Sequence, residues 1–404
     1  EIHRRLLAGD CGGMCEEAGA VVGRVAGALP EIHRRLLAGD CGGMCEEAGA
    51  VVGRVAGALP EIPAELARYD SRNNRLLLAA LEPLRVRVEA LAARYGRHRI
   101  GVVLGTSTSG ILETELAVAA ATAGQALPEG YDYVQQEMGS PALFLAELLG
   151  LDGVAYVVST ACSSSAKAVA AAARLLSQGL CDAVICGGAD SLCQLTQRGF
   201  AALESVSPDL CQPMSARRRG INIGEGAALF IASREPGPVA LLGYGESSDA
   251  WHMSSPHPEG RGAEAAMRQA LSMAGAEAAQ VGYVNLHGTA TVKNDEMESL
   301  AMTRVFPDGV PASSTKPLVG HLLGAAGATE LGFCWLVLSD RRRRLPPHVW
   351  DGAADPALPA LNLTPAGATL PAGRPLVMSN SYAFGGNNVS LLLAATAADE
   401  NEHA

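Results

Sequence analysis

The chain has 404 residues, of which 48% are hydrophobic and 18% charged, and its formal net charge is −11. This composition supplies a large core and excludes a disordered chain, and the negative charge argues against a protein that tracks nucleic-acid phosphates. No apolar run reaches the roughly 18 residues of a membrane span, and the N-terminus lacks a signal-peptide apolar region. Ten irregularly spaced cysteines indicate reduced thiols. We therefore expect a cytoplasmic protein with no nucleic-acid or membrane partner.

The chain begins with an exact tandem duplication, because residues 1–30 recur unchanged as residues 31–60. Solenoid repeats drift in sequence and need more copies, so this is no repeat architecture. Each copy holds a C-x-x-x-C pair, which is not the usual C-x-x-C spacing of a zinc site, and we expect no metal. Residues 20–28 are strand-like and 31–39 predict a short helix that ends at Gly39. The duplication therefore predicts a strand–turn–helix unit at 20–39, with 1–19 as a loose extension.

Strands and helices alternate through the first half, residues 61–236. The patterns predict helices at 65–80, 85–95, 141–149 and 163–178, and strands at 100–104, 154–158, 183–186 and 227–233. The helix at 65–80 carries Arg68, Arg72 and Arg75 on or near one face, which alone indicates a solvated surface. The segment REPGPV breaks any element and marks the boundary near residue 236.

The second half, residues 237–396, repeats this alternation and is followed by a tail at 397–404. The expected strands lie at 239–244, 281–286, 376–379 and 389–393, and the expected helices at 262–275, 295–303 and 324–338. Alternating strands and helices predict an α/β fold with mainly parallel sheets. Because strand-end loops carry the chemistry in such folds, we expect two similar halves that meet at one site.

Cys162 lies where a predicted strand ends and an Ala-rich helix begins. The unpaired N–H groups and positive dipole end of that helix favour the reactive thiolate. Ser163, Ser164 and Ser165 fit the first helical turn, where hydroxyl groups cap free amides. The position suits a nucleophile, although a buried structural cysteine would fit equally well.

Reactive side chains in the second half favour the catalytic interpretation. His287 directly follows a predicted strand, and His321 lies five residues after Lys316 at the start of an apolar helix. Neutral imidazoles at these places can donate hydrogen bonds to a developing oxyanion or enolate. Gly385 and Gly386 let the backbone approach a ligand, and free N–H groups beside them could complete an oxyanion hole. A lone histidine is usually structural, but the combination indicates catalysis.

Six motifs in register resemble the β-ketoacyl-acyl-carrier-protein synthase family over about residues 61–396. They are TACSSSAKA around Cys162, GGAD, GEGA, HGTAT, STK…GH…GAAGA and FGGNN. The resemblance implies the thiolase-like five-layered αβαβα fold and decarboxylative Claisen condensation. An acyl chain on Cys162 would react with malonyl-acyl-carrier protein to give 3-oxoacyl-acyl-carrier protein and CO2, in fatty-acid or polyketide-type synthesis. The segments GTSTSGI and SSS are more similar to condensing enzymes of aryl-polyene pathways than to housekeeping fatty-acid synthases.

The resemblance also implies roles for individual residues around the thiol. His287 and His321 match the pair that stabilises the enolate, and Lys316 matches the lysine that orders the site, with Glu298 as its ion-pair partner. Phe384 matches the gating phenylalanine, and its backbone N–H with that of Cys162 would form the oxyanion hole.

Residues farther from the thiol have implied binding roles. Thr289 and Thr291 match the threonines that hydrogen-bond the phosphopantetheine arm, and Gly385 and Gly386 belong to the loop beside it. Arg72 and Arg75 lie where the family places basic residues that receive the acidic carrier protein. No cofactor is expected, since phosphopantetheine arrives on the carrier protein.

The chain departs from the family pattern in three places. HGTAT replaces the commoner HGTGT or HGTST. The family opens with a central strand, for which only the 20–39 unit can substitute, and SARRRGINIGEGA replaces the usual aspartate-containing loop before GEGA. The expected assembly is a homodimer or a heterodimer with a ketosynthase-like subunit. A non-catalytic chain-length partner subunit is the alternative, but such partners lack the cysteine. A thiolase would need a second cysteine near the C-terminus, and the last one here is Cys334.

Overall fold

The computed structural model describes residues 13–22, 25–26, 29–47 and 49–396. In that part of the chain the strands form one twelve-stranded sheet and a separate hairpin of β3 and β4. The order in the sheet is β12-β11-β10-β13-β14-β9-β1-β8-β7-β5-β6, and β2 pairs with β1. The strands are β1 Gly13–Val22, β2 Val25–Ala26, β3 Met44–Glu47, β4 Ala50–Gly53, β5 Ile100–Gly105, β6 Ala155–Val158, β7 Ala183–Asp190, β8 Gly226–Ser233, β9 Val239–Ser248, β10 Val281–Asn285, β11 Pro311–Ser313, β12 Asn362–Leu363, β13 Leu376–Ala383 and β14 Asn387–Ala395.

The two ends of the sheet repeat one topology. In each half the first strand, β1 or β9, lies beside the last, β8 or β14, and then come β7 or β13, β5 or β10, and β6 or β11. Pairing is parallel from β7 to β6 and from β13 to β12, whereas the strands between β7 and β13 pair antiparallel. The two similar halves expected from the sequence are therefore present, and they meet where β1 touches β9.

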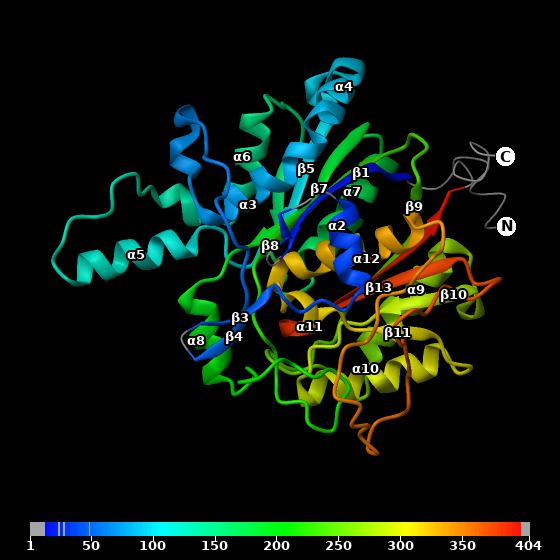
Figure 1. Cartoon of the computed structure of the whole chain (residues 1–404). Helices are drawn as coiled ribbons and strands as arrows, with labels where there is room; N and C mark the ends of the chain where they lie inside the picture. Colours follow the sequence, from blue (N-terminus) through cyan, green and yellow to red (C-terminus); the bar gives the residue numbers. More distant parts are fainter. Residues whose placement is uncertain (1–12, 23–24, 27–28, 48, 397–404) are drawn as a thin grey trace.

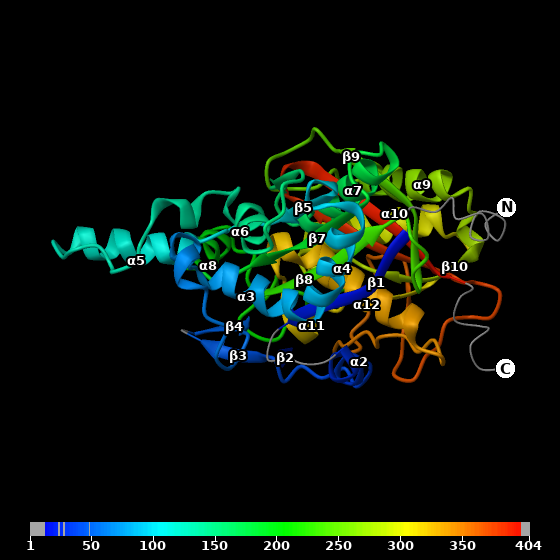
Figure 2. The same cartoon turned by 90° about the horizontal axis from the view of Figure 1, so that it is seen from above.

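Helices form three layers around the two halves (Figures 1 and 2). Helices α3, α4 and α6 cover the outer face of the first half, α9 and α10 cover the second, and α7 and α12 lie between the halves. This gives the five-layered αβαβα thiolase-like fold. The helices are α2 Leu29–Leu37, α3 Arg72–Leu81, α4 Arg85–Tyr95, α5 Ile111–Thr122, α6 Ser140–Leu148, α7 Ser164–Ser177, α8 Gln194–Ala202, α9 Arg261–Ala274, α10 Val292–Val305, α11 Lys316–Val319 and α12 Ala326–Ser339.

Composition explains why α7 and α12 occupy the centre. Residues 326–338 of α12 are almost all apolar. All of them are buried except Gly332, which is half-buried, as a helix enclosed between the two halves of the sheet requires. Small side chains let the two helices approach closely: a Cβ on Gly327 would lie 2.7 Å from the Cβ of Ala166. The Ser165 hydroxyl then accepts a hydrogen bond from the Ala328 N–H at 2.9 Å. The start of each central helix is thus fixed against the other.

The duplicated block folds in two different ways. In the first copy, the decapeptide GMCEEAGAVV forms β1, which pairs with β8 and touches β9. In the second copy, the same ten residues, 43–52, contribute to the separate β3–β4 hairpin. The predicted strand therefore exists but begins earlier, at Gly13, so residues 13–19 are no loose extension; residues 1–12 lie outside the described part. The helix predicted to end at Gly39 is α2.

Two further expectations differ from the structure. The helix predicted at 65–80 is divided at Asp70 into a 3₁₀ segment, Ala64–Tyr69, and α3, whose N-cap Ser71 accepts from the Asn74 N–H. The strand predicted as buried at 154–158 is β6. Its side chains are partly exposed, because it lies at the edge of the sheet and pairs with β5 alone among the described strands.

The duplication offers a matched pair of substitutions. Proline removes a ladder N–H and is poorly tolerated in a central strand. We expect Val21→Pro, in β1, to lower the free energy of unfolding by roughly 2–3 kcal/mol. The identical change Val51→Pro, in the peripheral hairpin, should cost about 1 kcal/mol or less. Urea unfolding monitored by circular dichroism checks both values, and equal losses would contradict the central position of β1.

Candidate active site

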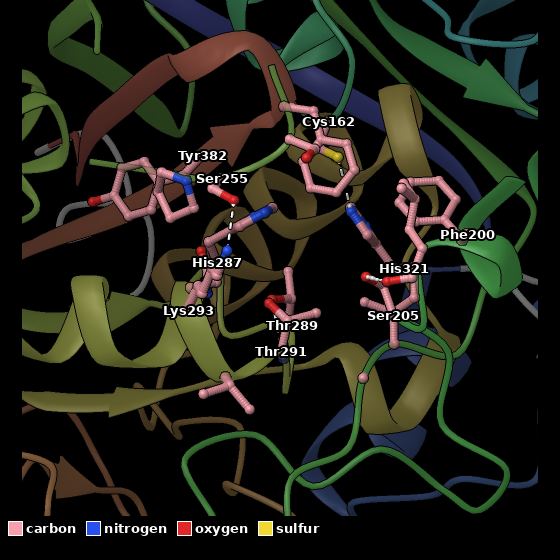
Figure 3. Close-up of a pocket in the computed structure, with 18 of the residues that line it drawn as sticks. Cys162, Phe200, Ser205, Ser255, His287, Thr289, Thr291, Lys293, His321 and Tyr382 are labelled. Carbon is pink, nitrogen blue, oxygen red and sulfur yellow. Dashed lines mark hydrogen bonds between the residues drawn. The ribbon is translucent and has the colours of Figure 1, made fainter. Parts of the chain in front are cut away.

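A cavity of about 310 Å³ lies where the two halves meet, and Figure 3 shows side chains from both halves pointing into it. Six of the residues predicted for the site line this cavity: Cys162, His287, Thr289, Thr291, His321 and Phe384. Lys316 and Glu298 are buried behind its wall, whereas Gly385, Gly386, Arg72 and Arg75 do not line it.

Cys162 lies in the turn between β6 and α7. The turn is tight because Ala161 adopts the left-handed conformation, with φ of 53°, which non-glycine residues rarely take. The thiol is buried, and its Sγ lies 3.0 Å from Nε2 of His321 (Figure 3). This turn therefore directs the sulfur toward an imidazole of the other half.

The Cys162 thiol is protonated at neutral pH. Burial raises its pKa to about 12, against the opposing effects of the Lys316 charge and of the backbone N–H groups of Cys162 and Phe384. The N–H group at the helix end lowers the pKa, as we expected, but desolvation of the buried thiol outweighs it. Proton transfer to His321 Nε2 is the direct route to the reactive form.

The serines that follow Cys162 do not cap α7 as predicted. No side chain caps this helix in the described structure. The Ser163 hydroxyl donates to the Thr160 carbonyl, and the Ser164 hydroxyl accepts from the Thr160 N–H and donates to the Ala161 carbonyl. These bonds hold the turn that precedes the helix, so their effect is on the position of Cys162.

His287 and His321 face each other across the cavity as neutral imidazoles. Their ring centroids are 5.4 Å apart and the rings are almost perpendicular. Burial, with the nearby Lys316 charge, holds the pKa of both rings well below the usual 6.5. Lys316 Nζ lies 3.5 Å from Nδ1 of His287. Since an ammonium only donates, Nδ1 accepts and the ring proton resides on Nε2.

Lys316 is paired with Glu330, not with Glu298. Its buried ammonium donates to Oε1 of Glu330 at 2.6 Å and to the backbone oxygen of His287 at 2.5 Å. Glu298 instead accepts from the N–H groups of His287 and Gly288, at 2.8 and 2.7 Å, and burial raises its pKa to about 7. The predicted ion pair was therefore wrong, although both carboxylates hold the His287 turn in place.

Asp190 is a structural residue that the sequence analysis did not single out. Its buried carboxylate accepts hydrogen bonds from the 106–108 turn and from the Gly324 N–H just before α12. It thereby connects the two halves directly beneath the site. The only sequence signal for it was the GGAD motif at the end of β7.

The loop that contains Phe384 closes one side of the cavity. The Phe384 ring packs against Phe200, with centroids 5.5 Å apart. Gly385 and Gly386 have φ of 79° and 74°, where other residues are strained. The Gly385 N–H donates to the Met253 carbonyl at 2.8 Å, whereas the Phe384 N–H is directed at the Cys162 sulfur. The glycines shape the loop that positions the Phe384 N–H toward the sulfur.

Thr289 and Thr291 lie farther from the thiol on the cavity wall (Figure 3). Their hydroxyl oxygens are 2.8 Å apart, and Ala290 between them has φ of 62°. This sharp turn directs both hydroxyl groups to one side, where they can bond an extended polar ligand.

Arg72 and Arg75 do not form a free basic surface. Arg72 donates to both oxygens of Glu225, a fully buried carboxylate, and to the Val55 carbonyl. Arg75 forms two hydrogen bonds with Asp70 at 2.6 Å. The charge of Arg72 neutralises a carboxylate in the core and the charge of Arg75 is balanced by Asp70. The carrier-protein contact of both residues stays a prediction.

Fold and site together define a thiolase-like acyltransferase. Sequence models of the β-ketoacyl synthase N-terminal and C-terminal domains match residues 38–236 and 239–349, and the chain belongs to the β-ketoacyl synthase family. It is an enzyme of the 3-oxoacyl-[acyl-carrier-protein] synthase class.

The chain is similar to several named proteins. It is 33% identical over 307 residues to Nodulation protein E of Rhizobium meliloti, covering 72% of this chain and 75% of that protein. It is 32% identical over 320 residues to 3-oxoacyl-[acyl-carrier-protein] synthase 2 of Vibrio cholerae, covering 73% and 75%. A chain in the complex of the ketosynthase ApeO with its chain length factor ApeC, from Xenorhabdus doucetiae, superimposes with a TM-score of 0.90 at 47% identity, covering 96% and 98%.

The pH dependence of alkylation tests the protonation state of Cys162. With a pKa of about 12, the thiolate fraction rises about tenfold per pH unit throughout the neutral range. Iodoacetamide modification of Cys162, followed by peptide mass spectrometry, should therefore accelerate steadily from pH 7 to 9. A small thiol reagent, whose rate levels off above its pKa near 8.5, is the control, and a plateau for Cys162 near pH 7 would contradict the account.

Arg72 and Arg75 provide a matched test of these two ion pairs. Arg72 makes the two short contacts to the buried Glu225 carboxylate, whereas Arg54 lies farther from it, at 3.7 Å. Losing the short contacts, Arg72→Met should lower the free energy of unfolding by about 3 kcal/mol. Arg75→Met removes a partly exposed pair and should cost less than about 1 kcal/mol. Urea unfolding measures both, and a stable Arg72→Met variant that binds carrier protein weakly would restore the surface interpretation.

Proposed function

We propose that this enzyme catalyses decarboxylative Claisen condensation between an acyl thioester on Cys162 and malonyl-acyl-carrier protein. The observation that carries the proposal is the cluster of a buried thiol and two neutral imidazoles at the meeting point of the halves. A nucleophile and two neutral hydrogen-bonding groups are what acyl transfer followed by enolate formation needs.

In the first step the chain takes the acyl group from its carrier. His321 Nε2 accepts the Cys162 proton at 3.0 Å, and the thiolate attacks the thioester carbonyl. The backbone N–H groups of Cys162 and Phe384 face the sulfur and stabilise the oxyanion. The carrier thiolate leaves and regains a proton from His321, so the enzyme is left as a neutral acyl thioester.

In the second step malonyl-carrier protein occupies the emptied cavity. The Nε2 proton of His287 is directed into the cavity because Lys316 occupies the Nδ1 side. That proton can hydrogen-bond the malonyl thioester oxygen as CO2 departs and the enolate forms. The enolate carbon attacks the acyl thioester, and the Cys162 thiolate leaves. It takes up one proton that enters from water, because His321 returned its own proton to the carrier thiol in the first step. The products are 3-oxoacyl-carrier protein and CO2.

The proposal includes the partner and the setting. The chain resembles a structure of a ketosynthase in complex with a chain length factor, and exposed apolar side chains on α5 and β6, among them Leu116, Val118 and Tyr156, are available for a partner surface. Figure 2 shows α5 projecting from the body. We favour a heterodimer of this kind. We also propose that the enzyme acts in the cytoplasm, in polyene or related synthesis. It would need no cofactor, since phosphopantetheine arrives on the carrier protein. The alternative of a non-catalytic subunit does not account for the Cys162–His321 contact.

Two substitutions separate the proposed steps. Cys162→Ala should abolish acyl loading and condensation, because no other described thiol faces the cavity. His287→Ala should retain acylation of Cys162 but lose at least about a hundredfold in CO2 release, since general acid–base and oxyanion groups contribute on that scale. Intact-protein mass spectrometry measures acylation, and trapped ¹⁴CO2 measures decarboxylation.

The outcomes are distinguishable. Elongation that persists in Cys162→Ala would remove the nucleophile assignment. Loss of acylation in His287→Ala, with the fold intact by circular dichroism, would contradict the division between the two steps.

A further inference from the structure

The cavity bears two cations that the proposed chemistry at the thiol does not use. Arg219 and Lys293 both line it, and both are exposed, whereas Cys162, His287 and His321 at its other end are buried. Among the described residues that line the cavity, Glu204 is the one carboxylate. The outer part of the cavity therefore carries net positive charge in an enzyme whose overall charge is −11.

Hydrogen bonds of the next two residues fix the backbone at Arg219. The Gly220 N–H donates to the Ala290 carbonyl at 2.9 Å, between Thr289 and Thr291, and the Ile221 N–H donates to the Ser205 carbonyl at 2.8 Å. Gly220 has φ of 127°, and a Cβ there would lie 2.3 Å from the Ser205 oxygen. The backbone that presents Arg219 is thus fixed beside the threonine turn.

The guanidinium and the ammonium are both available to a ligand. Arg219 lies 3.6 Å from Asp209, and both side chains are mostly exposed, so this pair is weak and exchangeable. The Lys293 ammonium donates to the Ser255 hydroxyl at 3.0 Å (Figure 3), a neutral partner. Within the described residues Lys293 forms no ion pair with a carboxylate. Its charge is therefore unbalanced at the cavity wall.

The proposed substrate indicates which anion the two cations would bind. In the proposed reaction the malonyl carboxylate must reach His287 and His321 at the buried end, because it departs there as CO2. The phosphopantetheine arm has one other anionic group, the phosphate at its far end. The cavity begins at the nucleophile, and its cations lie at the outer end. They can therefore bind that phosphate, since guanidinium and ammonium groups both bind phosphate well.

We propose that Arg219 and Lys293 bind the phosphate of the phosphopantetheine arm and so set the depth to which the thioester enters. This inference rests on the proposed function. It also gives a role to the SARRRG segment, where three consecutive arginines replace the loop usual in the family. Of these, Arg218 is buried against Asp355 and Arg217 lies near Asp351, which leaves Arg219 as the one that faces the cavity.

A comparison of donors tests the proposal. Acyl-pantetheine, acyl-phosphopantetheine and acyl-carrier protein are offered to the unsubstituted chain, to the double variant Arg219→Ala with Lys293→Ala, and to the control Arg217→Ala. The rate of Cys162 acylation by mass spectrometry gives kcat/KM. The double variant should lose about tenfold with both phosphorylated donors and nothing with acyl-pantetheine. Arg217→Ala, an exposed arginine outside the cavity, should match the unsubstituted chain with all three.

Each other result overturns the proposal. Equal losses of kcat/KM with acyl-pantetheine and acyl-phosphopantetheine would show that the two cations do not bind the phosphate. The absence of any loss would show the same. A loss with the carrier protein alone would assign them to acidic side chains of that protein. Absence of acylation from every donor in the unsubstituted chain would instead contradict the proposed function.

Discussion

The buried ammonium of Lys316 is the interaction on which the rest of the site depends. It is 1% exposed and lies between the Glu330 carboxylate and the backbone oxygen of His287. A buried cation is costly unless it is paired, and Glu330 supplies that pairing from the central helix α12. With its charge fixed there, Lys316 disfavours protonation of both imidazoles and occupies Nδ1 of His287. The two rings therefore remain neutral donors and acceptors.

The pseudo-symmetry of the fold explains why these groups meet. Cys162 follows β6 and Lys316 and His321 follow β11, which are equivalent strands in the two halves. The central helices α7 and α12 follow these segments, and Ser165 and Ala328 tie their starts together. A nucleophile from one half and a base from the other are thus brought within 3.0 Å by the same topology used twice. Asp190 fixes the halves beside this contact.

Much of this arrangement could be predicted from the sequence. Strand-end positions and motif spacing identified Cys162, His287 and His321, because local patterns determine which side chains leave a strand at the site. The errors concern partners chosen in three dimensions. Lys316 pairs with Glu330 rather than Glu298, and Arg72 with the distant Glu225. Likewise, helix-end arguments could not predict how strongly burial raises the Cys162 pKa. The decapeptide that forms both β1 and the β3–β4 region shows directly that surroundings select the structure of a local sequence.

A single-turnover experiment tests the central claim most directly. The enzyme is first loaded with one labelled acyl group on Cys162, purified, and then mixed with malonyl-acyl-carrier protein. The account predicts that loss of the label from Cys162, appearance of labelled 3-oxoacyl-carrier protein and release of one equivalent of CO2 proceed together at one rate. Release of CO2 or formation of 3-oxoacyl product while Cys162 remains acylated would contradict it.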